Sequence, residues 1–178
     1  GEQVNKTFPG VTVLYAPFFL MAHGISLLFG LPADGYAYTY QLFYLIGFWC
    51  YVLLGMILFR NVLRALDISP KIADLSLIIL FGATNLFFYT VYDQSVTHLY
   101  SFFLINWSVW ILLKLQTHPS LSKLTLLGAL LALIVITRPT NALVLFLFLF
   151  FLPEWSAYRT ILAPFLHIKN VLKAIIPA

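Results

Sequence analysis

Two short polar stretches interrupt the otherwise apolar chain, and they carry the side chains best suited to chemistry. The first runs from Tyr92 to His98 and holds a carboxylate, Asp93, five residues before the imidazole of His98. At the start of a helix, such a pair could bind a divalent metal, orient a hydroxyl group or relay a proton. The alternative is structural: Asp93 caps the following helix, and His98 hydrogen-bonds a neighbouring backbone group.

The second stretch runs from Thr137 to Asn141 and places Arg138 beside Pro139, between two apolar segments. Pro139 should end the incoming helix near Arg138, and Thr140 or Asn141 can cap the outgoing one. The amide groups of a helix start and a planar guanidinium both favour an oxyanion, so Arg138, Thr140 and Asn141 are candidates for phosphate binding. The simpler alternative is an arginine on a tight turn that reaches the membrane interface.

Polar residues on the flanking segments could extend these stretches into a substrate cavity. The helical period of roughly 100° per residue puts four polar side chains on one face of the segment after Asp93: Gln94, His98, Ser101 and Ser108. The preceding segment presents a second polar face, formed by Asn85, Tyr89 and Tyr92. Two such faces could form a cavity wall, although hydroxyl and amide groups also hold membrane helices together.

The elements that position these residues are hydrophobic and long. The 178-residue chain is 62% hydrophobic and 9% charged, with a mean hydropathy of +0.95, whereas about a quarter of the residues in soluble domains are charged. We therefore expect a membrane protein whose main partner is the lipid bilayer. A single cysteine, Cys50, excludes a disulfide-rich secreted domain, and a net charge of +4 spread over separate loops gives no indication of nucleic-acid binding.

The uncharged segments predict an all-α, polytopic transmembrane bundle that forms one module over residues 1–178. A helix of about 20 apolar residues crosses a hydrocarbon core of roughly 30 Å. By this measure we expect about five spans, at 35–60, 74–92, 94–114, 120–137 and 140–158. The uncharged segment 7–33 is also long enough to cross, but it contains Pro17 and His23, so composition leaves its placement open. The tail, 159–178, is expected to be an interfacial helix or the start of a further span.

The basic residues predict the orientation. If every segment from residue 35 onward spans, eight of the ten Lys and Arg residues fall on one side: Arg60, Arg64, Lys71, Lys114, Lys123, Arg159, Lys169 and Lys173. By the positive-inside rule, that side is cytoplasmic. The outer side then receives Asp34, Asp93 and Arg138. Both polar stretches are therefore expected on the extracytoplasmic face.

Small residues within the spans predict where helices pack. One face of the second segment carries three tyrosines and two glycines: Tyr40, Tyr44, Gly47, Tyr51 and Gly55. We interpret this face as a helix-packing seam rather than a surface for stacking sugars. Gly128 and Ala132, four residues apart, are likewise expected to pack against another helix.

Short motifs occur in a characteristic order along the chain: Asn5-Lys6 with Pro9-Gly10, Pro17-Phe18-Phe19 with Ala22-His23, Tyr40-Gln41, Thr84-Asn85-Leu86, Ser95 to His98 with Tyr100 to Phe103, His118-Pro119-Ser120, and Thr137 to Asn141. In this order they resemble the membrane module of the C-type glycosyltransferase superfamily. That group uses polyprenyl-phosphate-linked sugars and includes protein O-mannosyltransferases and the lipid A aminoarabinose transferase. The chain looks most like bacterial members, which implies the bacterial inner membrane.

The resemblance implies roles for individual residues. Segment 9–30 would be a juxtamembrane helix on the outer surface, and Lys6, with Asn85, Tyr89 and Gln94, would line the substrate cavity. Asp93, with His98 nearby, would organise the acceptor or a divalent metal, Mg²⁺ or Mn²⁺, and Arg138 would face the lipid phosphate. The family's principal catalytic carboxylate lies in an outer loop that would precede Gly1. We therefore expect a fragment of the enzyme, and we assign no catalytic residue within it.

The expected function is transfer of a sugar from a polyprenyl-phosphate donor to an acceptor on the extracytoplasmic face. The alternative is a non-catalytic membrane subunit, or a degenerate relative, that uses these helices only for assembly with other membrane subunits. A transporter is disfavoured because no internal repeat of about 20–50 residues is found.

Overall fold

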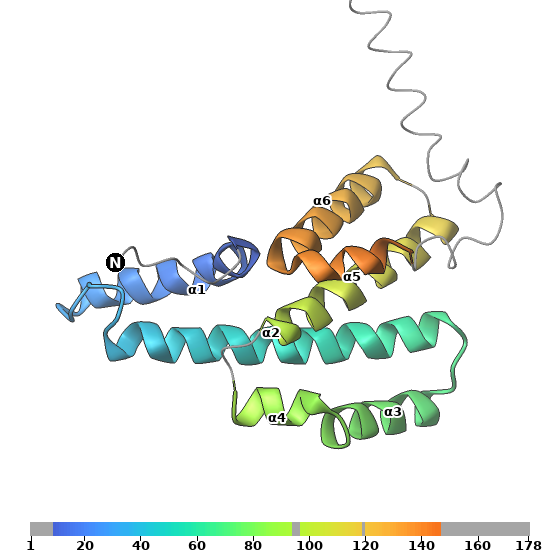
Figure 1. Cartoon of the computed structure of the whole chain (residues 1–178), viewed down its shortest axis with the longest axis horizontal. Coiled ribbons are helices and arrows are strands. Elements are labelled where there is room, and N and C mark those ends of the chain that lie inside the picture. Colours follow the sequence, from blue (N-terminus) through green and yellow to red (C-terminus); the bar gives the residue numbers. More distant parts are fainter. Residues whose placement is uncertain (1–8, 94–96, 119, 147–178) are drawn as a thin grey trace, which may run out of the picture.

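The computed structural model describes residues 9–93, 97–118 and 120–146 (Figure 1). Over these residues the chain is all-α and has no strand, as predicted; its elements are α1 Pro9–Leu28, α2 Tyr38–Ala65, α3 Pro70–Gly82, α4 Asn85–Val91, α5 His98–Thr117, α6 Leu121–Thr137 and the 3₁₀ helix η1 Pro139–Leu143. Lys6, Gln94, the tail 159–178 and most of the predicted span 140–158 lie outside the described residues.

Helix α2 is the element around which the others are arranged. Its 28 residues extend over about 42 Å. Helix α1 runs antiparallel along its amino-terminal half (Figure 1): the Tyr51 hydroxyl donates to the Leu14 carbonyl at 2.7 Å, while Nδ1 of His23 lies 2.6 Å from the Tyr40 hydroxyl. The helix predicted over 9–30 is therefore present. Its location on the membrane surface stays a prediction.

Helix α5 runs parallel to the carboxy-terminal half of α2. The rings of Tyr51 and Tyr100 lie 5.5 Å apart near the start of α5, and Val62 packs with Leu113 near its end. Helix α5 therefore begins beside the middle of α2, close to the first turns of α1. Figure 1 shows α3 and α4 on the opposite side of α2 from α1. The starts of α1 and α5 therefore both lie near the middle of α2.

Two glycines of α2 allow this close packing. A Cβ atom at Gly47 would lie 2.6 Å from the Phe18 ring of α1, and one at Gly55 would lie 2.7 Å from the Phe102 ring of α5. The packing seam predicted on this face is therefore confirmed at both glycines. The same prediction was wrong for Gly128, which is exposed and has no described atom within 4 Å of a Cβ built on it.

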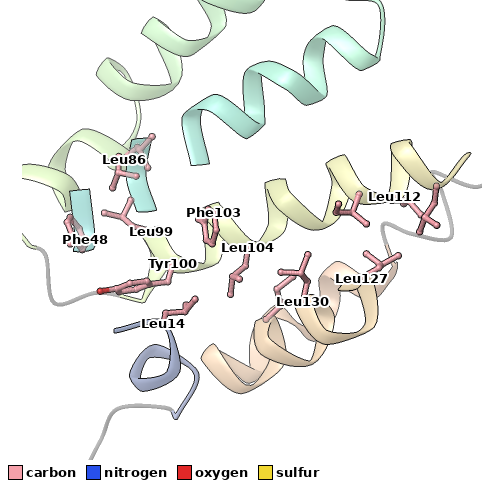
Figure 2. Close-up of a cluster of buried hydrophobic side chains, with 14 residues drawn as sticks. Leu14, Phe48, Leu86, Leu99, Tyr100, Phe103, Leu104, Leu112, Leu127 and Leu130 are labelled. Carbon is pink, nitrogen blue, oxygen red and sulfur yellow. The ribbon is translucent and has the colours of Figure 1, made fainter. Parts of the chain in front are cut away.

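The main hydrophobic core surrounds α5 (Figure 2). Leu104 and Leu112 of α5 face Leu127 and Leu130 of α6, and the core continues through Tyr100 toward α1. Most residues of α5 are buried, whereas only a minority of the residues of α1 and α2 are. Exposed apolar side chains on α2 and α3 fit contact with lipid chains, as with Leu53, Ile57, Ile72 and Ile78.

Three described helices are long and apolar enough to cross a bilayer, namely α1, α2 and α5, and a broken α3–α4 pair would make a fourth. The segment predicted as a span over 74–92 contains two helices, because the axis bends by 59° between Gly82 and Asn85. The cause is local: Thr84 is extended, and its hydroxyl accepts a hydrogen bond from the Leu86 amide at 3.1 Å, which caps α4. Helix α6, at 17 residues, occupies most of the predicted span 120–137.

Candidate functional site

The amino-terminal end of α5 brings together residues from both polar stretches of the sequence. The His98 ring stacks on the Tyr89 ring of α4, with centroids 5.0 Å apart and an interplanar angle of 14°. Nη1 of Arg138 lies 2.7 Å from His98 Nδ1 and 3.1 Å from Nε2. A guanidinium carries only donors, so the ring nitrogen that it contacts must accept, and the imidazole is neutral in this arrangement.

Arg138 reaches His98 because α6 ends immediately before it. The backbone of Arg138 is extended, and Pro139 cannot continue the incoming helix. The Thr137 hydroxyl donates to the Leu133 carbonyl at 2.7 Å, and Thr137 packs so tightly against Gly10 of α1 that a Cβ there would clash with its backbone. The end of α6 is therefore held against the start of α1.

Asn141 does not have the capping role predicted for it. Helix η1 begins directly after Arg138, and the Nδ2 amide of Asn141 donates to the Ser101 hydroxyl at 2.7 Å instead. Ser101 in turn donates to the Thr97 carbonyl at 3.0 Å. The capping prediction was wrong for Thr140 as well, which is exposed. The Asn141 contact ties η1 to α5 and keeps Arg138 beside His98.

A cavity of about 390 Å³ opens beside His98. It lies between α4 and α5 and is lined by Leu80, Thr84, Asn85, Leu86, Tyr89, His98, Leu99 and Phe102. Three residues proposed to form a common wall, Asn85, Tyr89 and His98, therefore share one cavity. Ser108 belongs to the same sequence stripe but is buried, and its hydroxyl donates to the Leu104 carbonyl at 2.8 Å. Ser108 is therefore a core residue.

A larger pocket of about 570 Å³ lies near the start of α2, and we name it the tyrosine pocket. Its lining comes from α1, from the loop before α2, from α2 itself and from the end of α4: Tyr15, Gly35, Tyr36, Tyr40, Gln41, Tyr44, Leu45, Tyr92 and Asp93. Asp93 thus lies in the tyrosine pocket, whereas His98 lies in the smaller cavity. The sequence interpretation missed Tyr15 and Tyr36 and treated Tyr40 and Tyr44 as packing residues only.

The loop before α2 is organised by Asp34. Its Oδ1 atom accepts hydrogen bonds from the amides of Tyr36 and Ala37, both at 2.8 Å. These two donors hold the pKa of the Asp34 carboxyl below its usual range. Gln41 closes the turn by donating from Nε2 to the Tyr36 carbonyl at 3.1 Å. The turn therefore places Tyr36 at the mouth of the pocket.

The deeper tyrosines are held by contacts between α1 and α2. The Tyr15 hydroxyl donates to the Tyr40 carbonyl at 3.1 Å, and its ring meets Tyr44 edge to face at 5.3 Å. Tyr44 also shares a side-chain hydrogen bond with Tyr100 of the core. A signal for this pocket was present in the sequence, because Tyr36, Tyr40 and Tyr44 recur at intervals of four residues, which is the spacing of one helix face.

The two cavities differ in charge. Arg138 lies beside the smaller cavity, whereas the described residues that line the tyrosine pocket include one carboxylate and no Lys, Arg or His. Within the described ranges, no three His, Cys, Asp or Glu side chains come together as a metal site would require. Lys6 and Gln94, proposed as lining residues, fall outside those ranges.

No protein-family model, curated protein or solved structure matches this chain. The described residues form a helical bundle with three or four apolar helices that could cross a bilayer.

Proposed function

We propose that this chain is the membrane module of a glycosyltransferase that moves a sugar from a polyprenyl-phosphate donor to an acceptor on the extracytoplasmic face of a bacterial inner membrane. The observation that carries the proposal is the position of Arg138. Its guanidinium lies where the end of α6 meets the start of α5, beside His98 and a largely apolar cavity. A lipid phosphate fits these surroundings, because its anionic headgroup can meet the guanidinium while its apolar chain meets the apolar surface.

Arg138 would act on the leaving group. When the acceptor attacks the anomeric carbon, the bond to the lipid phosphate breaks and negative charge grows on that phosphate. A fixed cation stabilises this charge more in the transition state than in the ground state. Arg138 uses one guanidinium nitrogen on His98, which leaves donors for two phosphate oxygens. His98 and Asn141 act as positioning residues in this scheme.

Asp93 and a divalent metal enter the proposal through the family resemblance. A Mg²⁺ or Mn²⁺ ion at Asp93 would find one carboxylate among tyrosine hydroxyls in the tyrosine pocket. Mg²⁺ commonly binds with one or two carboxylates and takes its other ligands from water and substrate phosphates. His98 is a poor additional ligand here, because its ring contacts the cationic Arg138. The proposed step therefore relies on Arg138 alone.

The test is binding of polyprenyl phosphate to the full-length protein in detergent. Arg138→Ala removes a charge-assisted contact, so we expect about a tenfold or greater loss of affinity, measured by displacement of a fluorescent polyprenyl phosphate. Lys123→Ala is the matched control, because it removes a cation that lies at the opposite end of α6. Equal affinity of wild type and Arg138→Ala would refute the phosphate role.

A non-catalytic membrane subunit is the second candidate, and the exposed face of α3 favours it. Leu75, Ile78 and Ile79 are more than half exposed, so this face must meet lipid or another membrane helix. Co-purification of a stable stoichiometric partner, together with wild-type protein that binds no polyprenyl phosphate, would favour this alternative over the enzyme.

A further inference from the structure

The tyrosine pocket carries aromatic faces together with negative charge. Five of its described lining residues are tyrosines, and Asp93 is the one charged residue among those described. A second carboxylate, that of Asp34, lies in the turn immediately before the lining residues Gly35 and Tyr36. None of the described Lys or Arg residues lines the pocket. The described charge at the tyrosine pocket is therefore negative, opposite to that of Arg138 beside the smaller cavity.

An aromatic pocket with a carboxylate is suited to a cation. The faces of tyrosine rings carry partial negative charge and attract ammonium groups, most strongly when several rings surround the same site. A carboxylate adds a direct Coulomb attraction, which is larger inside a partly enclosed pocket than in water. A volume of about 570 Å³ holds a small headgroup with space to spare.

The rings are also fixed before a ligand arrives. Tyr15 and Tyr44 are locked edge to face, and Tyr40 is hydrogen-bonded through its hydroxyl to His23. At the mouth, Tyr36 and Tyr92 are 85% and 72% exposed, so their faces are available to an incoming group. Little side-chain ordering would be needed in the deep part of the pocket, which favours binding.

We propose that the tyrosine pocket binds a ligand that carries an ammonium group. Resting on the proposed function, we assign this ligand as the sugar acceptor, with its ammonium group among the tyrosines. The donor phosphate would then bind near Arg138 and the acceptor would bind through α1, α2 and the end of α4. The two substrates would approach from cavities of opposite charge, which would prevent the anionic donor from occupying the acceptor position.

The experiment compares choline with its neutral carbon isostere, dimethylbutanol. Binding of each to the full-length protein in detergent is measured by saturation-transfer NMR on the methyl protons. We expect wild type to prefer choline by about tenfold. Asp93→Asn and Tyr92→Leu should each reduce that preference, and Tyr92→Phe, which keeps the ring face, should retain it. Tyr38→Leu is the matched control, since Tyr38 is a 77% exposed tyrosine at the start of α2 that does not line the pocket.

Equal binding of choline and dimethylbutanol, or no binding of either, would overturn the proposal. Choline binding that Tyr38→Leu weakens as much as Tyr92→Leu would also overturn it, because the tyrosine pocket would then not be the site. Polyprenyl phosphate binding by the same samples reports on the proposed function separately. Loss of choline selectivity with intact lipid-phosphate binding would refute this inference alone.

Discussion

At the scale of single residues, the structure connects groups that are far apart in the sequence. Arg138 and His98 are 40 positions apart, as are Asn141 and Ser101, yet each pair is in hydrogen-bond contact. The two contacts occur on neighbouring turns of α5, so they act together to hold the segment after α6 against α5. A guanidinium held in this way has lost part of its side-chain freedom before a ligand binds, which lowers the entropic cost of binding.

Asp34 gives a residue-scale prediction about pH. Its folded-state pKa is lowered by two backbone donors, so its contribution to stability is complete above the ordinary aspartate pKa and is lost as pH falls through the lower, folded value. We expect Asp34→Ala to lower the melting temperature of the purified protein near neutral pH. The difference from wild type should shrink below about pH 4. Thermal unfolding measured from neutral to acidic pH checks this, and a difference that grows in acid would contradict it.

At the scale of elements, the glycines of α2 decide how closely the helices approach. A Cβ at Gly55 would contact both the Phe102 ring and, at 3.3 Å, the Phe103 backbone of α5. The ring could rotate, but the backbone can move only if α5 shifts. Since α5 carries His98 at its first position, a shift of α5 would also move one side of the candidate site.

Gly55→Ala and Gly128→Ala form a matched pair. Gly55→Ala should destabilise the protein by about 1–3 kcal/mol through overpacking. Gly128→Ala should be neutral or stabilising by up to about 1 kcal/mol, because alanine favours the helix and nothing described lies near the added methyl group. Unfolding in a denaturing detergent series measures both. Equal effects of the two substitutions would contradict the observed α2–α5 packing.

The sequence predicted the elements better than it predicted the cavities. The length of the uncharged segments and the spacing of Gly47 and Gly55 were enough to predict long apolar helices and a packing seam. The break at Thr84 was missed because hydropathy is continuous across it, and only the capping preference of threonine marks it. The tyrosine pocket was missed because it depends on α1 meeting α2 and the end of α4, a tertiary arrangement that no single segment encodes.

At the scale of the whole molecule, the candidate site residues of this helical bundle lie where helix ends meet. The starts of α1 and α5 and the end of α6 come together near the middle of α2, and Arg138 and His98 lie at this junction. The tyrosine pocket lies farther toward the start of α2. The basic residues Arg60 and Arg64 lie near the opposite end of α2. Both cavities are therefore displaced from the end of α2 that is predicted to be cytoplasmic.

The proposed transfer of a sugar from a polyprenyl phosphate, by the full-length protein on the extracytoplasmic face, can be measured directly. The most direct measurement uses sealed right-side-out membrane vesicles that contain the protein and a polyprenyl-phosphate-linked radioactive sugar. We expect a labelled product that membrane-impermeant periodate oxidises without lysis, and loss of that product with Arg138→Ala. A labelled product that periodate reaches only after lysis, or no transfer from any polyprenyl-phosphate sugar supplied, would contradict the proposal.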